Sequence, residues 1–300
     1  MERIFEYLIT EQEQTGNILN FLKARSYSQS LIAHLKRTPD GILKNGLHAG
    51  VREPLIKGDV LTIRLLEECS SASILPVVLP LSICYEDEDI LVIDKPSGMP
   101  IHPSQGNYNN TLANALAFYY LKQDTPFVYR CINRLDRDTS GLLIVAKHQY
   151  SAAILGAALW ENTIKREYLA VVTGTLTGSG SIQAPISRLS GSTIERQIDF
   201  QNGESAVTHY QALESKNGYT LTSIVLETGR THQIRVHMKH LGYPLPGDFL
   251  YNPDCRHISR QALHSHKLSF FHPITKAPLH FTSELPSDMR FLISENTLHQ

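Results

Sequence analysis

The chain has 300 residues, of which 42% are hydrophobic and 19% charged, with a formal net charge of −1 at pH 7. This is the composition of an ordinary globular protein, with enough length for one large domain or two unequal ones. The apolar stretches are too short to span a bilayer, and the N-terminus lacks the apolar core of a secretory signal. Four cysteines without a CxxC pair argue against a thiolate zinc site. We therefore expect a cytoplasmic protein that does not enter a membrane.

Charge is unevenly distributed along the chain. Between residues 20 and 65 there are eight Lys and Arg against three Asp and Glu, which gives a local charge of +5. Between residues 66 and 100 there are seven acidic residues and one Lys, which gives −6. A basic segment therefore precedes an acidic one, and the whole-chain average hides both.

Residues 1–66 are expected to form short helices followed by strands. Apolar residues recur at helical spacing over 18–22 and 31–35, and Ser28 or Ser30 can cap the second helix. Asn45-Gly46 is a strong turn signal. The alternation from Val60 to Leu65 then predicts a strand.

This order of elements, with Lys44-Asn45-Gly46 at the turn, resembles the S4-like RNA-binding domain of many RNA-modifying enzymes. The resemblance covers roughly residues 12–66, and we assign residues 1–66 to that domain. It implies that the basic residues Lys36, Arg37 and Lys44 contact RNA phosphates. The alternative is a small α/β appendage with a solvated basic face.

Residues 67–80 carry acids, serines and two prolines, which is typical of a linker. Residues 81–300 predict a strand-rich second domain. Strands are expected at 90–93, 142–145, 168–172, 206–213 and 219–227, and helices at 151–160 and 231–241. Gly242 is expected to end the second helix. The mixture predicts an α+β fold around a mostly antiparallel sheet.

The segment RLDRDTSGLLIVAK, residues 134–147, places Asp136 on a turn-rich loop that runs into an apolar strand. Loops on a rigid scaffold often carry catalytic residues. A carboxylate nucleophile must be kept ionised, which requires a nearby cation, and Arg134 and Arg137 are the local candidates. The simpler interpretation is that Asp136 or Asp138 caps the turn.

Arg230 lies in ETGRTHQIRVHMKHLG, residues 227–242, where a predicted strand gives way to a predicted helix. An Arg at that junction can reach across a cleft and hold a carboxylate with its planar fork, which Lys cannot do. His232, His237 and His240 follow, but their spacing is not that of the HExxH zinc motif. We expect them to be internally hydrogen-bonded or RNA-facing, and we expect no metal site.

Tyr168 opens a strand in KREYLAVV, residues 165–172, directly after Lys165 and Arg166. The two preceding positive charges add to the local charge at this point. The alternative for Tyr168 is a plain strand aromatic.

Five segments in this order resemble the ribosomal-large-subunit class of RNA pseudouridine synthases. They are YEDEDILVIDKPSGMPIHP (85–103), RLDRDTSGLLIVAK (134–147), KREYLAVV (165–172), ETGRTHQIRVHMKHLGYPLPGD (227–248) and LHSHKLSFFHP (263–273). The match spans about residues 85–291, and five ordered motifs of this length are highly specific. There is one departure, because Asn133 stands where the family usually has His. It casts doubt on any mechanism that needs a titrating imidazole there.

The resemblance implies a role for each matching residue. Asp136 matches the catalytic aspartate, and Arg230 matches the arginine that pairs with it. Tyr168 matches the aromatic residue that stacks on the target base. Arg134 matches an arginine associated with RNA binding and base extrusion, and Lys165 is expected to contact RNA as well.

The implied reaction converts uridine to pseudouridine in RNA after the target nucleotide is flipped out of its stack. Asp136 then either attacks ribose carbon 1 or abstracts a ribose proton, and the sequence leaves both open. The reaction requires no cofactor or metal. The expected partner is large-subunit ribosomal RNA, with transfer RNA as the alternative, and the chain is expected to be a monomer.

Two other functions fit parts of the sequence. A non-catalytic RNA-binding or ribosome-assembly factor would use the basic N-terminal module, but it leaves the combination of Asp136, Tyr168 and Arg230 unexplained. A nucleoside glycosidase would share the attack on ribose and would need a second acid, for which Asp138 is available. The flanking motifs favour polymeric RNA.

Overall fold

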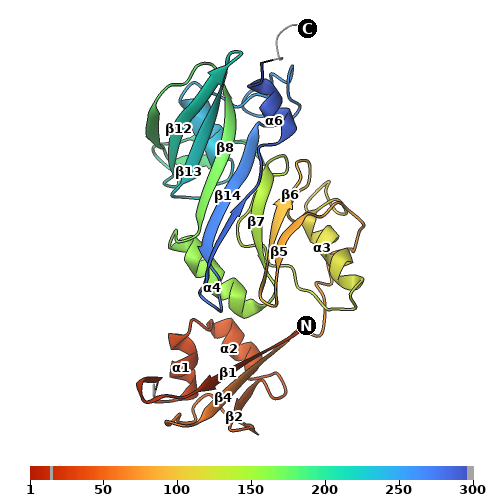
Figure 1. The fold of residues 1–300 in the computed structure, drawn as a ribbon, viewed down its shortest axis with the longest axis vertical. Coiled ribbons are helices and arrows are strands. Elements are labelled where there is room, and N and C mark those ends of the chain that lie inside the picture. Colours follow the sequence, from red (N-terminus) through yellow and green to blue (C-terminus); the bar gives the residue numbers. More distant parts are fainter. Residues whose placement is uncertain (14–15, 296–300) are drawn as a thin grey trace.

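The computed structural model describes residues 1–13 and 16–295. An N-terminal domain with a four-stranded sheet lies below a larger domain with a nine-stranded sheet (Figure 1). Within these described ranges, no helix is long and apolar enough to cross a membrane.

The N-terminal domain packs two helices against one antiparallel sheet, and a short 3-10 turn (Glu11–Glu13) follows its first strand. The helices are α1 (Ile18–Ala24) and α2 (Gln29–Leu35), and the strands in sheet order are β1 (Glu2–Leu8), β4 (Val60–Leu66), β2 (Ile42–Lys44) and β3 (Leu47–His48). Both predicted helices and the strand from Val60 are confirmed. Ser28 caps α2 by accepting a hydrogen bond from the Leu31 amide at 3.2 Å. Asn45 and Gly46, both at positive φ, form the predicted turn between β2 and β3.

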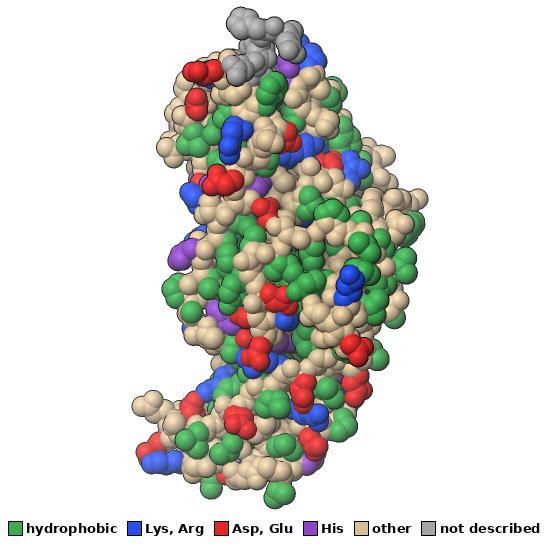
Figure 2. All heavy atoms as spheres, turned by 45° about the vertical axis from the view of Figure 1, so that its right-hand side comes forward, with side chains coloured by type: hydrophobic (Ala, Val, Ile, Leu, Met, Phe, Trp, Pro, Cys, Tyr) green, Lys and Arg blue, Asp and Glu red, His purple; other side chains and the backbone are tan. Residues whose placement is uncertain are grey.

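Strand β1 was not indicated by the sequence, and it pairs with β4 along its whole length. With β1 included, residues 1–66 hold nine Lys and Arg against seven Asp and Glu, so the domain is less basic than its central segment. Several of these charges pair within the domain, namely Arg25 with Glu13, Lys44 with Asp59, Lys57 with Glu11 and Arg64 with Glu2. On the face drawn in Figure 2, acidic and basic side chains are accordingly interspersed. The S4-like identity of the domain stays a prediction.

The larger domain is built on one sheet with helices beside it. In sheet order the strands are β5 (Ile83–Glu86), β6 (Ile90–Lys95), β7 (Ser140–Ala146), β14 (Leu263–Phe271), β8 (Lys165–Thr173), β13 (Tyr219–Leu226), β12 (Val207–Lys216) and β9 (Ser179–Gln183), with β15 (Pro278–Thr282) paired to β14. A separate hairpin joins β10 (Ile186–Arg188) to β11 (Arg196–Ile198), and the helices are α3 (Leu112–Leu121), α4 (Gln149–Trp160), α5 (Gln233–His240) and α6 (Ser287–Leu292). Among the strands of the described residues, β7 and β14 alone pair in parallel, so the mostly antiparallel α+β fold is confirmed.

The parallel pair depends on a glycine. Gly141, at the start of β7, has a φ of 106°, and a Cβ at this position would lie 2.2 Å from the Ser265 carbonyl oxygen of β14. Any side chain would therefore push the two strands apart at the end of the loop that carries Asp136. All seven residues of β7 are buried, so the loop rests on a rigid strand.

The two domains meet at a charged and aromatic contact. Arg3 of β1 donates to both carboxylate oxygens of Asp89, at 2.8 and 3.3 Å, and the Tyr27 and Tyr150 rings stack with centroids 4.0 Å apart. Burial opposes the ionisation of Asp89, but hydrogen bonds from His148 and Arg3 outweigh it and lower its pKa to about 2. Residues 67–80 between the domains form no helix or strand, and their assignment as a linker stays a prediction.

Candidate active site

A cleft of about 540 Å³ opens in the larger domain. Its walls come from the loop before β7, the end of α4, strand β8 and the turn that leads from β13 into α5. The cleft joins segments about a hundred residues apart in the sequence. Four residues singled out from the sequence line it together: Arg134, Asp136, Tyr168 and Arg230.

A buried lysine anchors the loop that carries Asp136. The Lys95 side chain is fully buried, and its Nζ donates to the carbonyl oxygens of Pro96, Met99 and Arg137 at 2.8, 2.9 and 2.9 Å. Burial lowers the pKa of Lys95 to about 7, against the opposing effect of the nearby carboxylates of Asp138 and Asp136. Because one of the three acceptors belongs to the residue after Asp136, Lys95 ties the loop to the scaffold.

Asn133 holds the other side of the same loop. Its side chain is buried, and its Oδ1 accepts a hydrogen bond of 2.8 Å from the Ile144 amide in β7. An amide carries no titratable proton at physiological pH, so this position fixes the loop against β7 and does not transfer protons. Asn133 therefore makes a defined structural contact at the position where the family usually has His.

The cation beside Asp136 is Arg235, whose Nη1 lies 3.0 Å from Asp136 Oδ2. Asp248 binds the opposite edge of the guanidinium, with Nε and Nη2 each donating to one carboxylate oxygen at 2.7 Å. Burial alone would lower the pKa of Arg235, but the two carboxylates outweigh it and raise the pKa. Arg235 is therefore permanently charged, and its direction is fixed by a two-point contact.

The prediction that Arg230 pairs with Asp136 is wrong. Arg230 Nη1 lies 2.5 Å from Glu204 Oε2, and its Nε donates to the Ser205 carbonyl oxygen at 3.1 Å. The local candidates are wrong as well, because Arg137 binds the carboxylate of its neighbour Asp138, and no ion pair of Arg134 is found among the described residues.

The start of α5 explains why Arg235, and not Arg230, contacts Asp136. His232 adopts a left-handed conformation with φ of 58° and ψ of 17°, so the helix begins at Gln233 rather than at 231. Arg230 consequently lies in the turn before the helix and reaches residues 204 and 205. Arg235, in the first turn of α5, is buried between the loop and Asp248. Arg230 and Arg235 both belong to the motif at residues 227–242, but their spacing in the sequence does not show which of the two side chains points to Asp136.

Asp136 does not cap its own turn through its side chain. The Thr139 amide donates to the backbone oxygen of Asp136 at 3.2 Å, which leaves the carboxylate to face Arg235. His232 approaches the same carboxylate, with Nε2 3.9 Å from Asp136 Oδ2, and its Nδ1 lies 2.9 Å from the Tyr251 hydroxyl. Burial lowers the pKa of His232, which favours the neutral ring.

Tyr168 lies on the cleft face of β8 and is 4% exposed. Burial raises the pKa of its hydroxyl, so the side chain is a neutral phenol at physiological pH. Arg166, two residues earlier in β8, also lines the cleft, whereas Lys165 donates to the Asn162 carbonyl oxygen at 2.8 Å and is not among the lining residues. The two-residue alternation of a strand could have identified Arg166 in place of Lys165.

The histidines of α5 do not converge. His237 is buried, with Nδ1 2.9 Å from the Thr208 hydroxyl and Nε2 2.8 Å from the Ala184 carbonyl oxygen, so its internal hydrogen bonding is confirmed. In the described part of the chain, metal-ligand spacing is found at Asp87, Asp89 and His272, outside the cleft. Asp89 already binds Arg3 and His148, so this cluster belongs to the domain contact.

The predicted RNA-binding residues of the N-terminal domain lie apart from the cleft. Lys36 and Arg37 are exposed at the end of α2. Lys44 instead donates to the Pro54 carbonyl oxygen at 2.9 Å and lies 3.1 Å from the Asp59 carboxylate. The charge of Lys44 is therefore already paired within the domain.

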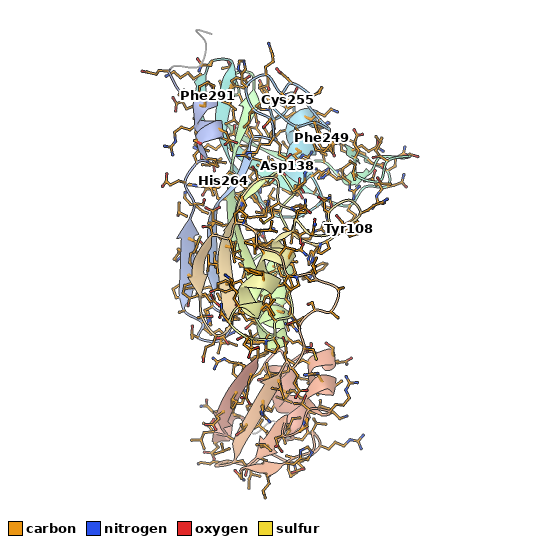
Figure 3. The ribbon with its side chains drawn as sticks, turned by 90° about the vertical axis from the view of Figure 1, so that its right-hand side faces the viewer. Tyr108, Asp138, Phe249, Cys255, His264 and Phe291 are labelled. Carbon is orange, nitrogen blue, oxygen red and sulfur yellow. The ribbon has the colours of Figure 1, made fainter. Side chains whose placement is uncertain are left out.

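Asp138 and Phe249 lie near one another in the upper part of the larger domain (Figure 3). The Arg137 guanidinium lies over the Phe249 ring, 5.7 Å from its centroid, and the Arg235 guanidinium lies 5.9 Å from the same centroid. The Asp138 carboxylate is bound by Arg137 and does not line the cleft. Asp136 is thus the one aspartate of this loop that faces it.

Comparison with known proteins adds an independent line of evidence. Residues 89–240 match a family model described as RNA pseudouridylate synthase. YjbO of Bacillus subtilis, named an uncharacterized RNA pseudouridine synthase, is 41% identical over 267 residues, covering 89% of this chain and 94% of its own. Ribosomal large subunit pseudouridine synthase D of Pseudomonas aeruginosa is 42% identical over 232 residues, 72% of each chain. The solved structure of human RNA Pseudouridylate Synthase Domain Containing 1 has a TM-score of 0.57 and 26% identity, covering 68% of this chain and 83% of its own.

Proposed function

The chain belongs to the RNA pseudouridylate synthase family, and we propose that Asp136 is the carboxylate that carries its reaction. The observation that carries this proposal is the contact of 3.0 Å between Asp136 and Arg235 at the cleft wall. A carboxylate held in one place by a fixed guanidinium can be aimed at a reacting atom, which nucleophilic or basic action requires.

The reaction is an isomerisation without group transfer. The bond between ribose carbon 1 and uracil nitrogen 1 breaks, the base turns, and carbon 5 forms the new bond. One proton leaves carbon 5 and one is gained at nitrogen 1. Asp136 would act first, either by attacking carbon 1 or by abstracting a ribose proton, and Arg235 would hold its carboxylate in position.

The other cleft residues would bind the flipped nucleotide. Extrusion of a base costs a few kcal/mol, and stacking on an aromatic side chain returns roughly 1–3 kcal/mol. Tyr168 is suited to this role, because it lies on the cleft face of a rigid strand. Arg134 and Arg230, at the cleft wall, would contact the RNA, and Lys165 would do so outside it.

The substrate that we propose is ribosomal RNA of the large subunit. The name of the Pseudomonas aeruginosa relative supports it, as does the N-terminal domain with Lys36 and Arg37 exposed at the end of α2. Transfer RNA is the alternative substrate. A nucleoside glycosidase is disfavoured, because Asp138, its available second acid, is bound to Arg137. We propose that the chain acts as a cytoplasmic monomer.

Pseudouridine mapping tests the proposal directly. Ribosomal and transfer RNA from cells with and without the gene would be compared by mass-shifted chemical labelling. We expect loss of one or a few pseudouridines in large-subunit ribosomal RNA, restored by the wild-type gene. Loss in transfer RNA alone would contradict the proposed substrate, and no loss in either RNA would contradict the proposed function.

A further inference from the structure

Two side chains at one end of the cleft have no part in the proposed reaction. Arg166 of β8 is 8% exposed, and Trp160, the only tryptophan of the chain, ends α4 and is 89% exposed. We propose that they form a subsite for the nucleotide next to the target uridine, in which Arg166 binds the phosphate and Trp160 stacks on the base. This subsite rests on the proposed function, since it takes the flipped uridine to lie on Tyr168.

Arg166 is a buried cation without an acidic partner. A buried charge is costly unless it is paired, and no carboxylate of the described residues lies within 4.0 Å of its guanidinium. Its Nε is buried and has no hydrogen-bond partner among the described residues, while the guanidinium forms a side-chain hydrogen bond with the Tyr168 hydroxyl, which carries no negative charge to balance it. A phosphate from the substrate would supply the missing charge and the oxygens that the planar fork of Arg binds best.

Arg166 lines the cleft beside Tyr168, with which it interacts. Its Nη1 lies 3.4 Å from the point that a Cβ at Gly229 would occupy, so the absent side chain leaves room for the guanidinium. The intervening residue Glu167 does not neutralise it. The Glu167 carboxylate points to the other face of the strand, where it lies 3.2 Å from Lys267 Nζ and accepts a hydrogen bond from Ser223.

The spacing along β8 fits a neighbouring nucleotide. Residues two apart in a strand share a face and lie about 6.6 Å apart. Arg166 and Tyr168 are two residues apart, and the distance of about 6.6 Å is comparable with that between neighbouring nucleotides of an RNA strand. Trp160 lies at the same end of the cleft, because α4 and β8 are joined only by residues 161–164.

Trp160 has the properties of a stacking platform. Its indole is almost completely exposed although it is the largest apolar side chain of the protein, and it lines the cleft instead of the core. Aromatic side chains of this kind bind bases without sequence preference. Leu159 and Gly156 of the same helix also line the cleft, and Gly156 carries no side chain that would fill it.

The single tryptophan provides a direct test, because its emission reports on Trp160 alone. The probe is hexauridylate RNA, titrated at low salt. We expect saturable quenching for the wild-type chain, and a dissociation constant about tenfold higher for Arg166→Gln. The slope of log affinity against log salt should fall by about 0.7, the value for one lost phosphate contact on a single strand. Unchanged emission when bound RNA is saturating, or wild-type affinity and slope in Arg166→Gln, would overturn the subsite.

Neutral phosphate analogues locate the contact. A methylphosphonate linkage beside the third uridine of hexauridylate removes one phosphate charge. It should weaken binding to the wild-type chain, but it should hardly weaken binding to Arg166→Gln, which has already lost the contact. Additive losses would contradict the assignment. The matched control is Phe291→Ala, which removes another exposed aromatic side chain, on α6 and outside the cleft (Figure 3), and should leave the quenching unchanged.

Activity separates this proposal from the proposed function. With large-subunit RNA from cells that lack the gene, Trp160→Ala should raise KM about tenfold, more than it lowers kcat. Its exposed position predicts an unchanged melting temperature, so folding does not confound this variant. Pseudouridine formation with wild-type KM in Trp160→Ala would overturn the subsite alone. Quenching without pseudouridine formation by the wild-type chain would overturn the proposed function, and Arg166 and Trp160 would remain only as a site that binds single-stranded RNA.

Discussion

Arg235 holds Asp136 with one nitrogen of a guanidinium whose two other nitrogens are bound by the fully buried Asp248. Asp248 thus fixes the plane of the Arg235 guanidinium. The remaining nitrogen, Nη1, then binds the Asp136 carboxylate at the cleft wall. The contacts measure 2.7 Å to Asp248 and 3.0 Å to Asp136. The position of the carboxylate therefore depends on one arginine.

Replacing Arg235 by Lys should remove this control. A lysine keeps the charge but cannot bind Asp248 at two points and Asp136 at a third. We expect kcat to fall by about 100-fold, since a small misplacement of a reacting group has an effect of that order. Single-turnover kinetics on large-subunit ribosomal RNA would measure it, and a fall in kcat below threefold would contradict the role of Arg235.

Arg230→Lys is the matched control for that substitution. Arg230 pairs with Glu204, whose side chain is 70% exposed, and such surface pairs contribute little to stability. We expect Arg230→Lys to act mainly on KM through weaker RNA contact. A larger fall in kcat for Arg230→Lys than for Arg235→Lys would reverse the assignment of the two arginines.

Tyr168 should contribute mainly through its ring to RNA binding. Measured in the Asp136→Asn background, which separates binding from turnover, Tyr168→Phe should stay within about threefold of the parent affinity, and Tyr168→Leu should bind about tenfold more weakly. Because burial raises the pKa of the hydroxyl, the phenol stays neutral at physiological pH, and RNA affinity should not change there through its ionisation. Equal loss in the Phe and Leu variants would contradict the stacking role.

Lys95 should make the stability of the protein depend on pH. Its pKa is about 7 in the folded chain and 10.5 ordinarily, so between these values the folded state holds fewer protons than the unfolded one. The free energy of unfolding therefore rises with pH through this window, by at most about 1.4 kcal/mol per pH unit from this group, and the contribution is smallest below pH 7.

Chemical denaturation of the wild-type chain and of Lys95→Met at pH 7, 8 and 9 would measure this effect. The variant should be less stable at each pH, because three carbonyl oxygens lose their donor, and it should lack the rise with pH. Parallel curves for the two proteins would contradict the low pKa of Lys95.

Much of the fold follows from local patterns in the sequence. Strand β7 is a run of apolar residues after a turn-rich loop, and α2 begins at the Ser28 cap, so both could be predicted from neighbouring residues. Strand β1 could not, because the charged residues of ERIFEYL, namely Glu2, Arg3 and Glu6, do not alternate regularly with apolar ones, and the strand is stabilised by pairing with β4, more than fifty residues later. The segment becomes recognisable as a strand only when that partner is known.

The site was predicted in composition but not in its contacts. Asp136 and Tyr168 could be placed because each belongs to a distinctive motif. The exchange of Arg230 for Arg235 could not be foreseen, because it depends on the left-handed conformation of His232, which is not a glycine. Lys95 was likewise missed, since a fully buried lysine has no signal in a single sequence apart from its place in a motif.

The N-terminal domain should contribute to RNA affinity through Lys36 and Arg37. The double variant Lys36→Gln, Arg37→Gln should bind large-subunit RNA more weakly and lower the slope of log affinity against log salt by up to about 1.4. Lys57→Gln is the control, because Lys57 is equally basic but pairs with Glu11 at 3.1 Å. A salt slope unchanged in the double variant would contradict a phosphate contact by this helix end.

The central claim is that Asp136 carries the reaction, and Asp136→Asn tests it most directly. The amide keeps the size of the side chain but cannot act as a nucleophile or a base. The variant would be incubated with large-subunit ribosomal RNA from cells lacking the gene, and pseudouridine and bound RNA would be measured on the same samples. We predict RNA binding within a few fold of the wild-type chain and no pseudouridine above background. Pseudouridine formation at the wild-type rate would contradict the account.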